Sequence, residues 1–222
     1  DTRHAMDMGD DRFYYGFGMP MDSESTNRGA HSKASIELSD RHTLGVGGEY
    51  LTYRLDDWWS PVGASGSMCC EKFWNVRDGE QSRLGVYGEW QAGWSPQWLS
   101  LVGARVDRIS SDAGDVQGYN DSMAMWSADA AAFNARDHRR ADTHVDVAAL
   151  LRYAPHEKIT FEGGYARKTR SPNLYERYAW STSAMAALMN NFVGDGNGYI
   201  GRIDLEPETA HSVSASGELH DA

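Results

Sequence analysis

Three residues near the start of the chain, His4, Met6 and Met8, offer an imidazole and two thioethers at alternating positions. Successive side chains of a β-strand point to opposite faces, so these residues share one face if the segment is extended. Imidazole nitrogen with thioether sulfur suits a soft ion such as Cu(I), whereas Mg²⁺ and Ca²⁺ prefer oxygen ligands. His4 and Met6 are therefore the first candidates for metal ligands and Met8 is a weaker one, although an isolated His-x-Met pattern is more often incidental.

Further soft side chains occur in segments that read as loops. Met68, Cys69 and Cys70 are consecutive, and two adjacent cysteines are no disulfide framework for a chain of this size. Their thiols are weaker copper candidates, and the simpler interpretation is an exposed or oxidised pair. Two other predicted loops also contain methionines, and we leave two roles open for them, binding of Cu(I) at low affinity and packing against other side chains. These methionines are Met123, Met125, Met185 and Met189.

Other motifs favour neither a calcium site nor an enzyme. The run Gly194–Tyr199 resembles a calcium loop, but Tyr199 and Ile200 stand where that loop needs a ligand and a glycine, so we interpret it as a glycine-rich turn. No nucleophile accompanies the polar run from His138 to Asp142, and no glycine-rich phosphate loop precedes a helix. We expect no catalytic residue and no cofactor.

The elements that must position these residues are strands with period-two alternation. We predict them at residues 32–38, 43–54, 82–92, 98–108, 143–153, 158–168 and 209–219. Short turns at 39–42, 95–97 and 154–157 alternate with long connections at 55–81, 109–142 and 169–208. Short turns on one side and long loops on the other are typical of outer-membrane β-barrels, and a soluble all-β protein with oversized loops is the alternative.

Aromatic residues near predicted strand ends support the same interpretation, because such barrels carry aromatic girdles at both membrane interfaces. They are Tyr50, Tyr53, Trp58, Trp59, Trp90, Trp94, Trp98, Tyr153 and Tyr165.

Composition excludes some classes of protein. The 222 residues are 41% hydrophobic with mean hydropathy -0.60, and no apolar run approaches the roughly 20 residues of a membrane-spanning helix. Spanning β-strands remain allowed, because they alternate lipid-facing and lumen-facing residues. A net charge of -11 without a basic tract argues against nucleic acid and anionic lipid headgroups as partners.

From Gly163 onward the sequence resembles the barrel of TonB-dependent receptors, in particular their copper receptor branch. Arg202-Ile203 and Glu206 depart from the residues usual there. Two signatures carry the resemblance, Arg170-Ser171-Pro172-Asn173-Leu174-Tyr175-Glu176 and Asp204-Leu205-Glu206-Pro207-Glu208.

This resemblance implies an all-β, antiparallel transmembrane barrel of the 22-stranded receptor type. Residues 1–222 would form part of it, about 8 strands with long extracellular loops, and the plug and C-terminal strands would lie outside the chain. In this family a His-x-Met pair on the barrel wall faces Cys and Met ligands from the plug, and His4 with Met6 matches that pair.

The function so implied is copper import across the outer membrane of a Gram-negative bacterium, energised by the TonB complex through the plug. The expected partners are outer-membrane lipid, the TonB complex and copper as the transported ion. Two alternatives remain open, a siderophore or other metal-chelate receptor and a surface adhesion or phage-binding protein.

Overall fold

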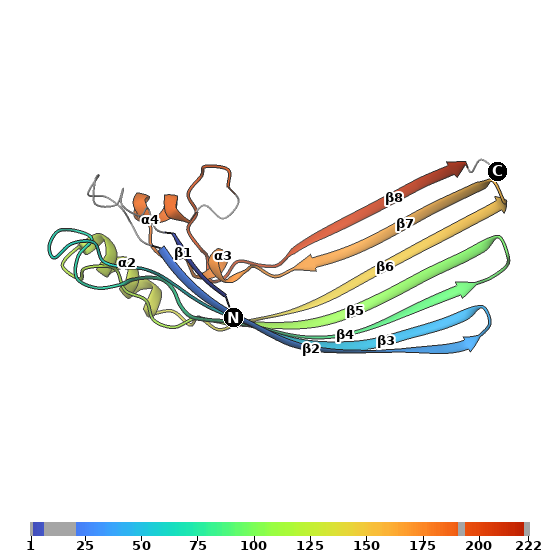
Figure 1. Ribbon diagram of the computed structural model, residues 1–222, viewed down its shortest axis with the longest axis horizontal. Coiled ribbons are helices and arrows are strands. Elements are labelled where there is room, and N and C mark those ends of the chain that lie inside the picture. Colours follow the sequence, from blue (N-terminus) through green and yellow to red (C-terminus); the bar gives the residue numbers. More distant parts are fainter. Residues whose placement is uncertain (1, 7–20, 191–193, 220–222) are drawn as a thin grey trace.

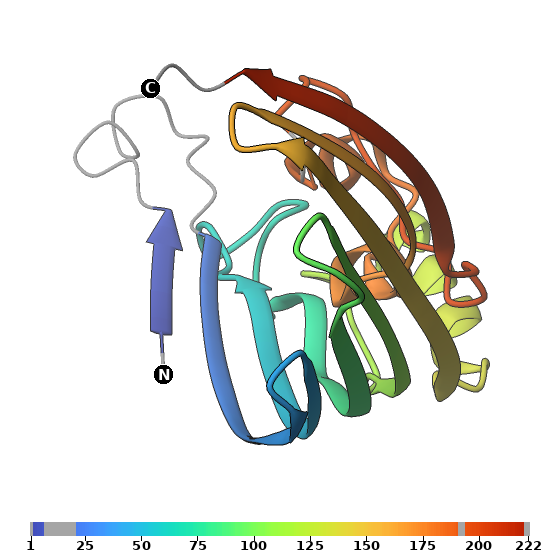
Figure 2. The ribbon, with the colours of Figure 1, turned by 90° about the vertical axis from the view of Figure 1, so that its right-hand side faces the viewer.

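The computed structural model describes residues 2–6, 21–190 and 194–219. Its strands form one eight-stranded antiparallel sheet in which each strand pairs with its neighbours in sequence (Figure 1). The strands are β1 Thr2–Met6, β2 Met21–Ser39, β3 His42–Trp59, β4 Phe73–Gly93, β5 Trp98–Asp112, β6 Arg140–His156, β7 Ile159–Arg170 and β8 Glu208–Leu219. Within the described residues no pairing joins β8 to β1, and the sheet curves like part of a cylinder wall (Figure 2). The predicted all-β partial barrel is confirmed.

The two faces of this sheet differ in chemistry because alternate residues point to opposite sides. One face, the apolar face, carries large exposed hydrophobic side chains at every second position. They include Ile36, Leu38, Val46, Tyr50, Leu84, Val86, Trp90, Val102, Val106, Val145, Leu151, Phe161, Tyr165, Val213 and Leu219. The polar face carries the intervening residues, among them Glu49, Arg83, Arg105 and Asp107.

Short turns close the sheet at one end, and the long connections gather at the other (Figure 1). The described parts of connections 60–72, 113–139 and 171–207, together with the adjoining ends of β3 and β4, form a folded unit that we call the cap. The cap contains α2 Ala124–Asn134, α3 Leu174–Tyr178 and α4 Ala184–Met189. None of the helices that the structure describes is both long enough and apolar enough to cross a membrane.

An aromatic core holds the cap together. Trp59 stacks on Phe73 at 4.4 Å between ring centroids, and Phe73 stacks on Trp180 at 5.0 Å. The other buried members are Leu55, Val76, Ala113, Val116, Tyr119, Trp126, Ala130, Phe133, Leu174, Tyr178, Ala186 and Ile203. Because they come from β3, β4 and the connections 113–139 and 171–207, these segments pack as one body, and the connection 60–72 adds partly buried Met68 against it.

The structure corrects several boundaries. Strands β2, β3 and β4 run further than predicted, so the connection expected at 55–81 shrinks to 60–72. The consecutive residues Trp58 and Trp59 are both buried by the cap, which removes the alternation that marks a half-exposed strand. Trp59 is thereby a member of the cap core, whereas Trp58 packs against Trp74 and lies under the Lys72 ammonium. The helices in the connections were not predicted.

Candidate functional site

Strand β1 carries the candidate copper residues and pairs with β2. His4 lies opposite Ser23 and Met6 opposite Met21, and these partners lie opposite Asp57 and Trp59 of β3. Residues directly opposite in an antiparallel sheet share a face. The register therefore assigns the positions of His4 and Met6 to the polar face. They stand in line with Ser23 and Asp57 and with Met21 and Trp59, at the end of the sheet where the cap begins. Met8 lies outside the described residues, as do the side chains of β1.

Arg170, the last residue of β7, joins the two sequence signatures. Its Nη1 and Nη2 donate to the Glu176 carboxylate at 2.9 and 3.0 Å, and its Nε donates to Glu208 at 2.5 Å. Glu176 belongs to the first signature and Glu208, the first residue of β8, to the second. The connection of 37 residues between β7 and β8 is thus closed at its base by one guanidinium.

Helix α3 begins at the same place. The Asn173 side chain accepts from the backbone N–H of Glu176 at 2.9 Å, and the Glu176 carboxylate accepts from the Asn173 N–H at 2.7 Å, which is a reciprocal capping box. The hydrogen bonds from Arg170 hold the pKa of Glu176 below its usual range, and burial acts in the opposite direction. The signature residues therefore fix where the loop turns and where its helix begins.

Arg177 is the strongest anchor in this region, and the sequence did not single it out. Its side chain is 1% exposed and donates to Ser111 Oγ at 2.6 Å, to Asp142 Oδ2 at 2.7 Å and to the Leu205 carbonyl at 3.2 Å. Ser171 Oγ donates to the same Asp142 oxygen at 2.8 Å. Both signatures are thus tied to the ends of β5 and β6. In the sequence, the adjacent residues Glu176 and Arg177 look like solvent-exposed charges of a loop. Only the fold reveals that the Arg177 side chain is buried.

The remaining signature residues have simpler surroundings. The Pro172 carbonyl accepts from Gln81 Nε2 at 3.0 Å, while Pro207 is half-buried. Asp204 is exposed and accepts from Arg202 at 3.0 Å, with Arg136 at 3.6 Å. These contacts position backbone and surface charge, and none forms a pocket.

A buried carboxyl lies where the polar face meets the cap. Asp57 of β3 is 4% exposed and accepts a 2.6 Å hydrogen bond from the Tyr175 hydroxyl of α3. Burial raises the pKa of Asp57 to about 6, and the hydrogen bond from Tyr175 partly offsets this. Tyr50 is the last large exposed hydrophobic residue that β3 contributes to the apolar face. Asp57 lies seven positions further along β3, toward the cap, and is therefore outside the part of the strand that carries the apolar face. Nearby, buried Asn75 donates to Asn190 at 2.8 Å.

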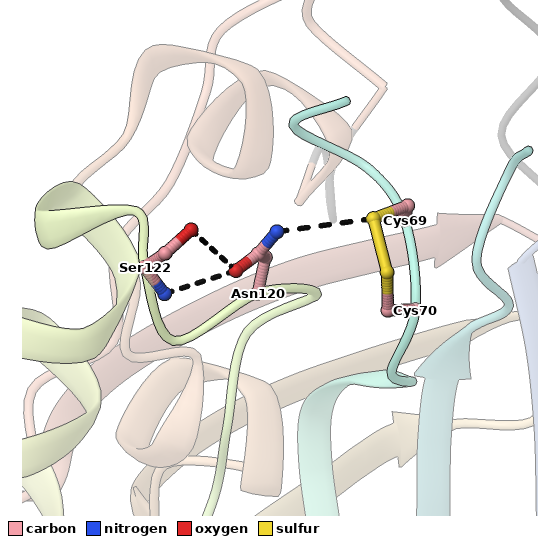
Figure 3. Close-up of a disulfide and its surroundings, with 4 residues drawn as sticks. All are labelled: Cys69, Cys70, Asn120 and Ser122. Atoms are coloured by element: carbon pink, nitrogen blue, oxygen red, sulfur yellow. Dashed lines mark hydrogen bonds between the residues drawn. A yellow bond between two sulfur atoms is a disulfide. The ribbon is translucent and has the colours of Figure 1, made fainter. Parts of the chain in front are cut away.

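The adjacent cysteines of the first connection are joined to each other as a disulfide (Figure 3). Asn120 Nδ2 lies 3.8 Å from Cys69 Sγ and links this segment to the connection before α2. In this oxidised form neither sulfur is a thiolate, which is the form that binds metals. Met68 packs against the cap core, as do Met123, Met185 and Met189, whereas Met125 is 49% exposed.

The polar face below the cap carries a charge cluster that the sequence did not indicate. Asp107 of β5 accepts from Arg105 at 2.7 Å and from Arg83 of β4 at 2.8 Å. Arg105 also reaches Glu49 of β3 at 3.0 Å. The residues are far apart in sequence, and the register of three strands brings them together. A polar wall of this kind suits contact with water or polar protein and not with lipid.

Two motifs set aside as non-catalytic have structural roles. Both ring nitrogens of buried His138 lie 2.9 Å from carbonyl oxygens, those of Ala113 and Phe133, so this ring fastens the connection around α2. Asp195 accepts from the Asn197 N–H at 3.0 Å and from the Tyr199 hydroxyl at 2.6 Å. That segment is therefore a turn closed by its own side chains.

Comparisons with known proteins agree with this architecture. A family model for the β-barrel of TonB-dependent receptor-like proteins matches residues 3–222. Among solved structures, the copper transporter OprC is similar with a TM-score of 0.60 at 17% identity, over 92% of this chain and 28% of that one. The FrpB iron transporter from Neisseria meningitidis (F3-3 variant) is similar with a TM-score of 0.49 at 16% identity, over 70% of this chain and 21% of that one. A search of curated proteins finds no match. The chain thus spans less than a third of either transporter.

Proposed function

This chain belongs to the TonB-dependent receptors, and we propose that it forms part of the barrel of a receptor that imports copper across the outer membrane. Proteins of this family are transporters of the Gram-negative outer membrane and not enzymes. In the proposal the apolar face contacts lipid, the polar face lines the lumen and the cap faces outward. Transport would be energised through TonB and a plug inside the barrel.

The register of β1 is the observation that carries the copper assignment. His4 and Met6 stand on the face proposed to line the lumen, in the row that also contains Met21. Imidazole and thioether favour Cu(I) over hard cations. The copper transporter OprC shares the fold, which supports the architecture, while the choice of ion depends on these residues.

Anaerobic Cu(I) binding by the full-length receptor tests the proposal. Wild type is compared with His4→Ala/Met6→Ala, and bound copper is quantified by elemental analysis after desalting. The matched control is Met125→Ala/His156→Ala, which removes the same residue types from a cap helix and from the exposed last position of β6.

We expect near-stoichiometric copper in wild type and control and its loss in the His4/Met6 variant. Copper that is retained by that variant, or is absent from wild type, would contradict the proposal. In that case a metal-chelate receptor becomes the better assignment, because its substrate is held by other groups and His4 and Met6 are incidental.

A further inference from the structure

The disulfide between Cys69 and Cys70 joins adjacent residues and so closes no loop of the chain. A disulfide stabilises a fold mainly by restricting the unfolded chain, and the effect grows with the length of the loop that it closes. The cap is held together instead by its aromatic core and by buried Arg177. Stability of the cap therefore does not account for this bond.

The two cysteines differ in exposure and in backbone conformation. Cys69 is 4% exposed, whereas Cys70 lies on the surface of the cap. The backbone of Cys70 has a φ of 95°, in a region that residues with a side chain rarely adopt. Strained or exposed disulfides are reduced more readily than buried structural ones. A small thiol can therefore reach the Cys70 sulfur, and breaking the bond allows the Cys70 backbone to relax.

An oriented amide group stands beside the other sulfur. Asn120 Nδ2 donates to Cys69 Sγ at 3.8 Å (Figure 3). Asn120 Oδ1 accepts from the Ser122 N–H at 2.9 Å and from Ser122 Oγ at 2.7 Å, which fixes which end of the amide faces the sulfur. A disulfide sulfur is a weak acceptor, whereas a thiolate is charged and accepts strongly. The amide is therefore arranged to stabilise the reduced, anionic form of Cys69 more than the disulfide.

A backbone hydrogen bond keeps this arrangement in place without help from the disulfide. The Glu71 N–H donates to the Tyr119 carbonyl at 3.0 Å, which joins the residue after Cys70 to the residue before Asn120. Neither sulfur takes part in this bond. Reduction therefore produces two adjacent thiols that stay beside the amide.

We propose that Cys69 and Cys70 form a redox-controlled metal site, which is closed as the disulfide and opened by a low-molecular-weight thiol. The thiolate of this reductant attacks Cys70 Sγ, forms a mixed disulfide and expels the Cys69 thiolate. A second reductant thiolate attacks the reductant sulfur of the mixed disulfide and releases the Cys70 thiolate. One protein disulfide and two reductant thiols thus become two cysteine thiols and one reductant disulfide.

The open site suits one Cu(I) ion. Thiolates are soft ligands that favour Cu(I), and both cysteines lose their thiol protons when the ion binds. The amide of Asn120 continues to donate to Cys69 in the metal-bound state. The choice of Cu(I) rests on the proposed function, whereas the opening of the disulfide by thiols does not.

Copper binding by the full-length receptor with and without thiol treatment tests the site. Every sample carries His4→Ala/Met6→Ala, so the result does not depend on whether those residues bind copper. The protein is treated with glutathione under anaerobic conditions, desalted, loaded with a Cu(I)–acetonitrile complex, desalted again and analysed for copper and free thiols. The matched control also carries Cys69→Ala/Cys70→Ala and defines what the rest of the receptor binds.

We expect glutathione to add about two free thiols and about one copper ion per chain, and to add neither in the cysteine control. Untreated protein should bind as little copper as the control. Equal copper in treated and untreated protein would overturn the proposal, as would an increase that persists in the cysteine control. New thiols without additional copper would also overturn it, because the disulfide would then open without forming a metal site.

Asn120→Asp tests the amide without removing a cysteine. Aspartate keeps an oxygen that accepts from Ser122, but it replaces the donor with a second acceptor that repels the departing thiolate. Free thiols should therefore appear at least about tenfold more slowly in glutathione, because a charge-assisted hydrogen bond is lost. Asn197→Asp makes the same change in an exposed turn and should react like wild type. Equal rates in the two variants would overturn the role of the amide.

Discussion

Replacing Arg177 by methionine should loosen the cap while the strands stay intact. The guanidinium is 1% exposed and makes hydrogen bonds to Ser111, to the Asp142 carboxylate and to the Leu205 carbonyl. Methionine fills much of the same volume but donates nothing, so Asp142, which is 14% exposed, loses its cation and keeps only Ser171 as a donor. Removing one partner of a buried ion pair costs about 3–5 kcal/mol.

Hydrogen exchange measures this cost, because cap amides exchange through local opening. A loss of about 3–5 kcal/mol corresponds to exchange roughly 10² to 4 × 10³ times faster, at about 1.4 kcal/mol per factor of ten. The amides to follow are those of Ala179 and Gly201, whose hydrogen bonds go to carbonyls of the same loop. Mid-strand amides of β4 should not change.

The control is Arg136→Met, because Arg136 makes only a half-exposed ion pair with Asp204 at 3.6 Å. An exposed pair of this kind is worth about 0–1 kcal/mol, so exchange should rise about fivefold at most. If Arg177→Met and Arg136→Met accelerate exchange equally, the buried guanidinium does not hold the cap together and the reasoning is refuted.

Three further predictions concern the same region. Asp57 has a pKa of about 6, above its ordinary value of about 3.9, so its contribution to cap stability is fully present below about pH 3.9 and is lost as pH rises through 6. Exchange of α3 amides, corrected for intrinsic rates, should therefore accelerate between about pH 4 and 6.5 in wild type, level off above that range and be flat in Asp57→Asn; the same slope in both would exclude Asp57 as its origin. Glu176→Ala removes the carboxylate shared by Arg170 and the capping box, so α3 should be less protected by about 1–2 kcal/mol, measured by the same method, and unchanged protection would contradict the capping role. Met21→Leu preserves packing against the cap core but removes a thioether opposite Met6, so Cu(I) retained by the full-length receptor after a chelator challenge should fall; retention equal to wild type would leave Met21 a packing residue only.

The strands were predictable from sequence where one of their faces is exposed. Leu84, Val86 and Trp90 alternate with polar residues, and the pattern correctly indicated a half-buried strand there. Near Trp59 and Phe73 the pattern fails because the cap covers the strand ends. Period-two reasoning cannot detect a strand whose two faces are both buried.

The site was predictable only where residues are close in sequence. His4 and Met6 are two positions apart, and the signature around Arg170 is contiguous. The link between Arg170 and Glu208 spans 38 positions, and that between Tyr175 and Asp57 spans 118. Such contacts depend on strand register and loop packing, which composition and spacing do not specify.

The common core of the cap also restricts how the sequence of the cap can vary over evolutionary time. A substitution at Trp59, Phe73 or Trp180 affects connections that are distant in sequence, because their rings stack in one continuous series. The exposed tips at Gly63–Ser67 and Gly194–Gly198 contribute no residue to that core. Insertions and sequence drift should therefore concentrate at these two tips. The aromatic residues beneath them should change rarely, and then together.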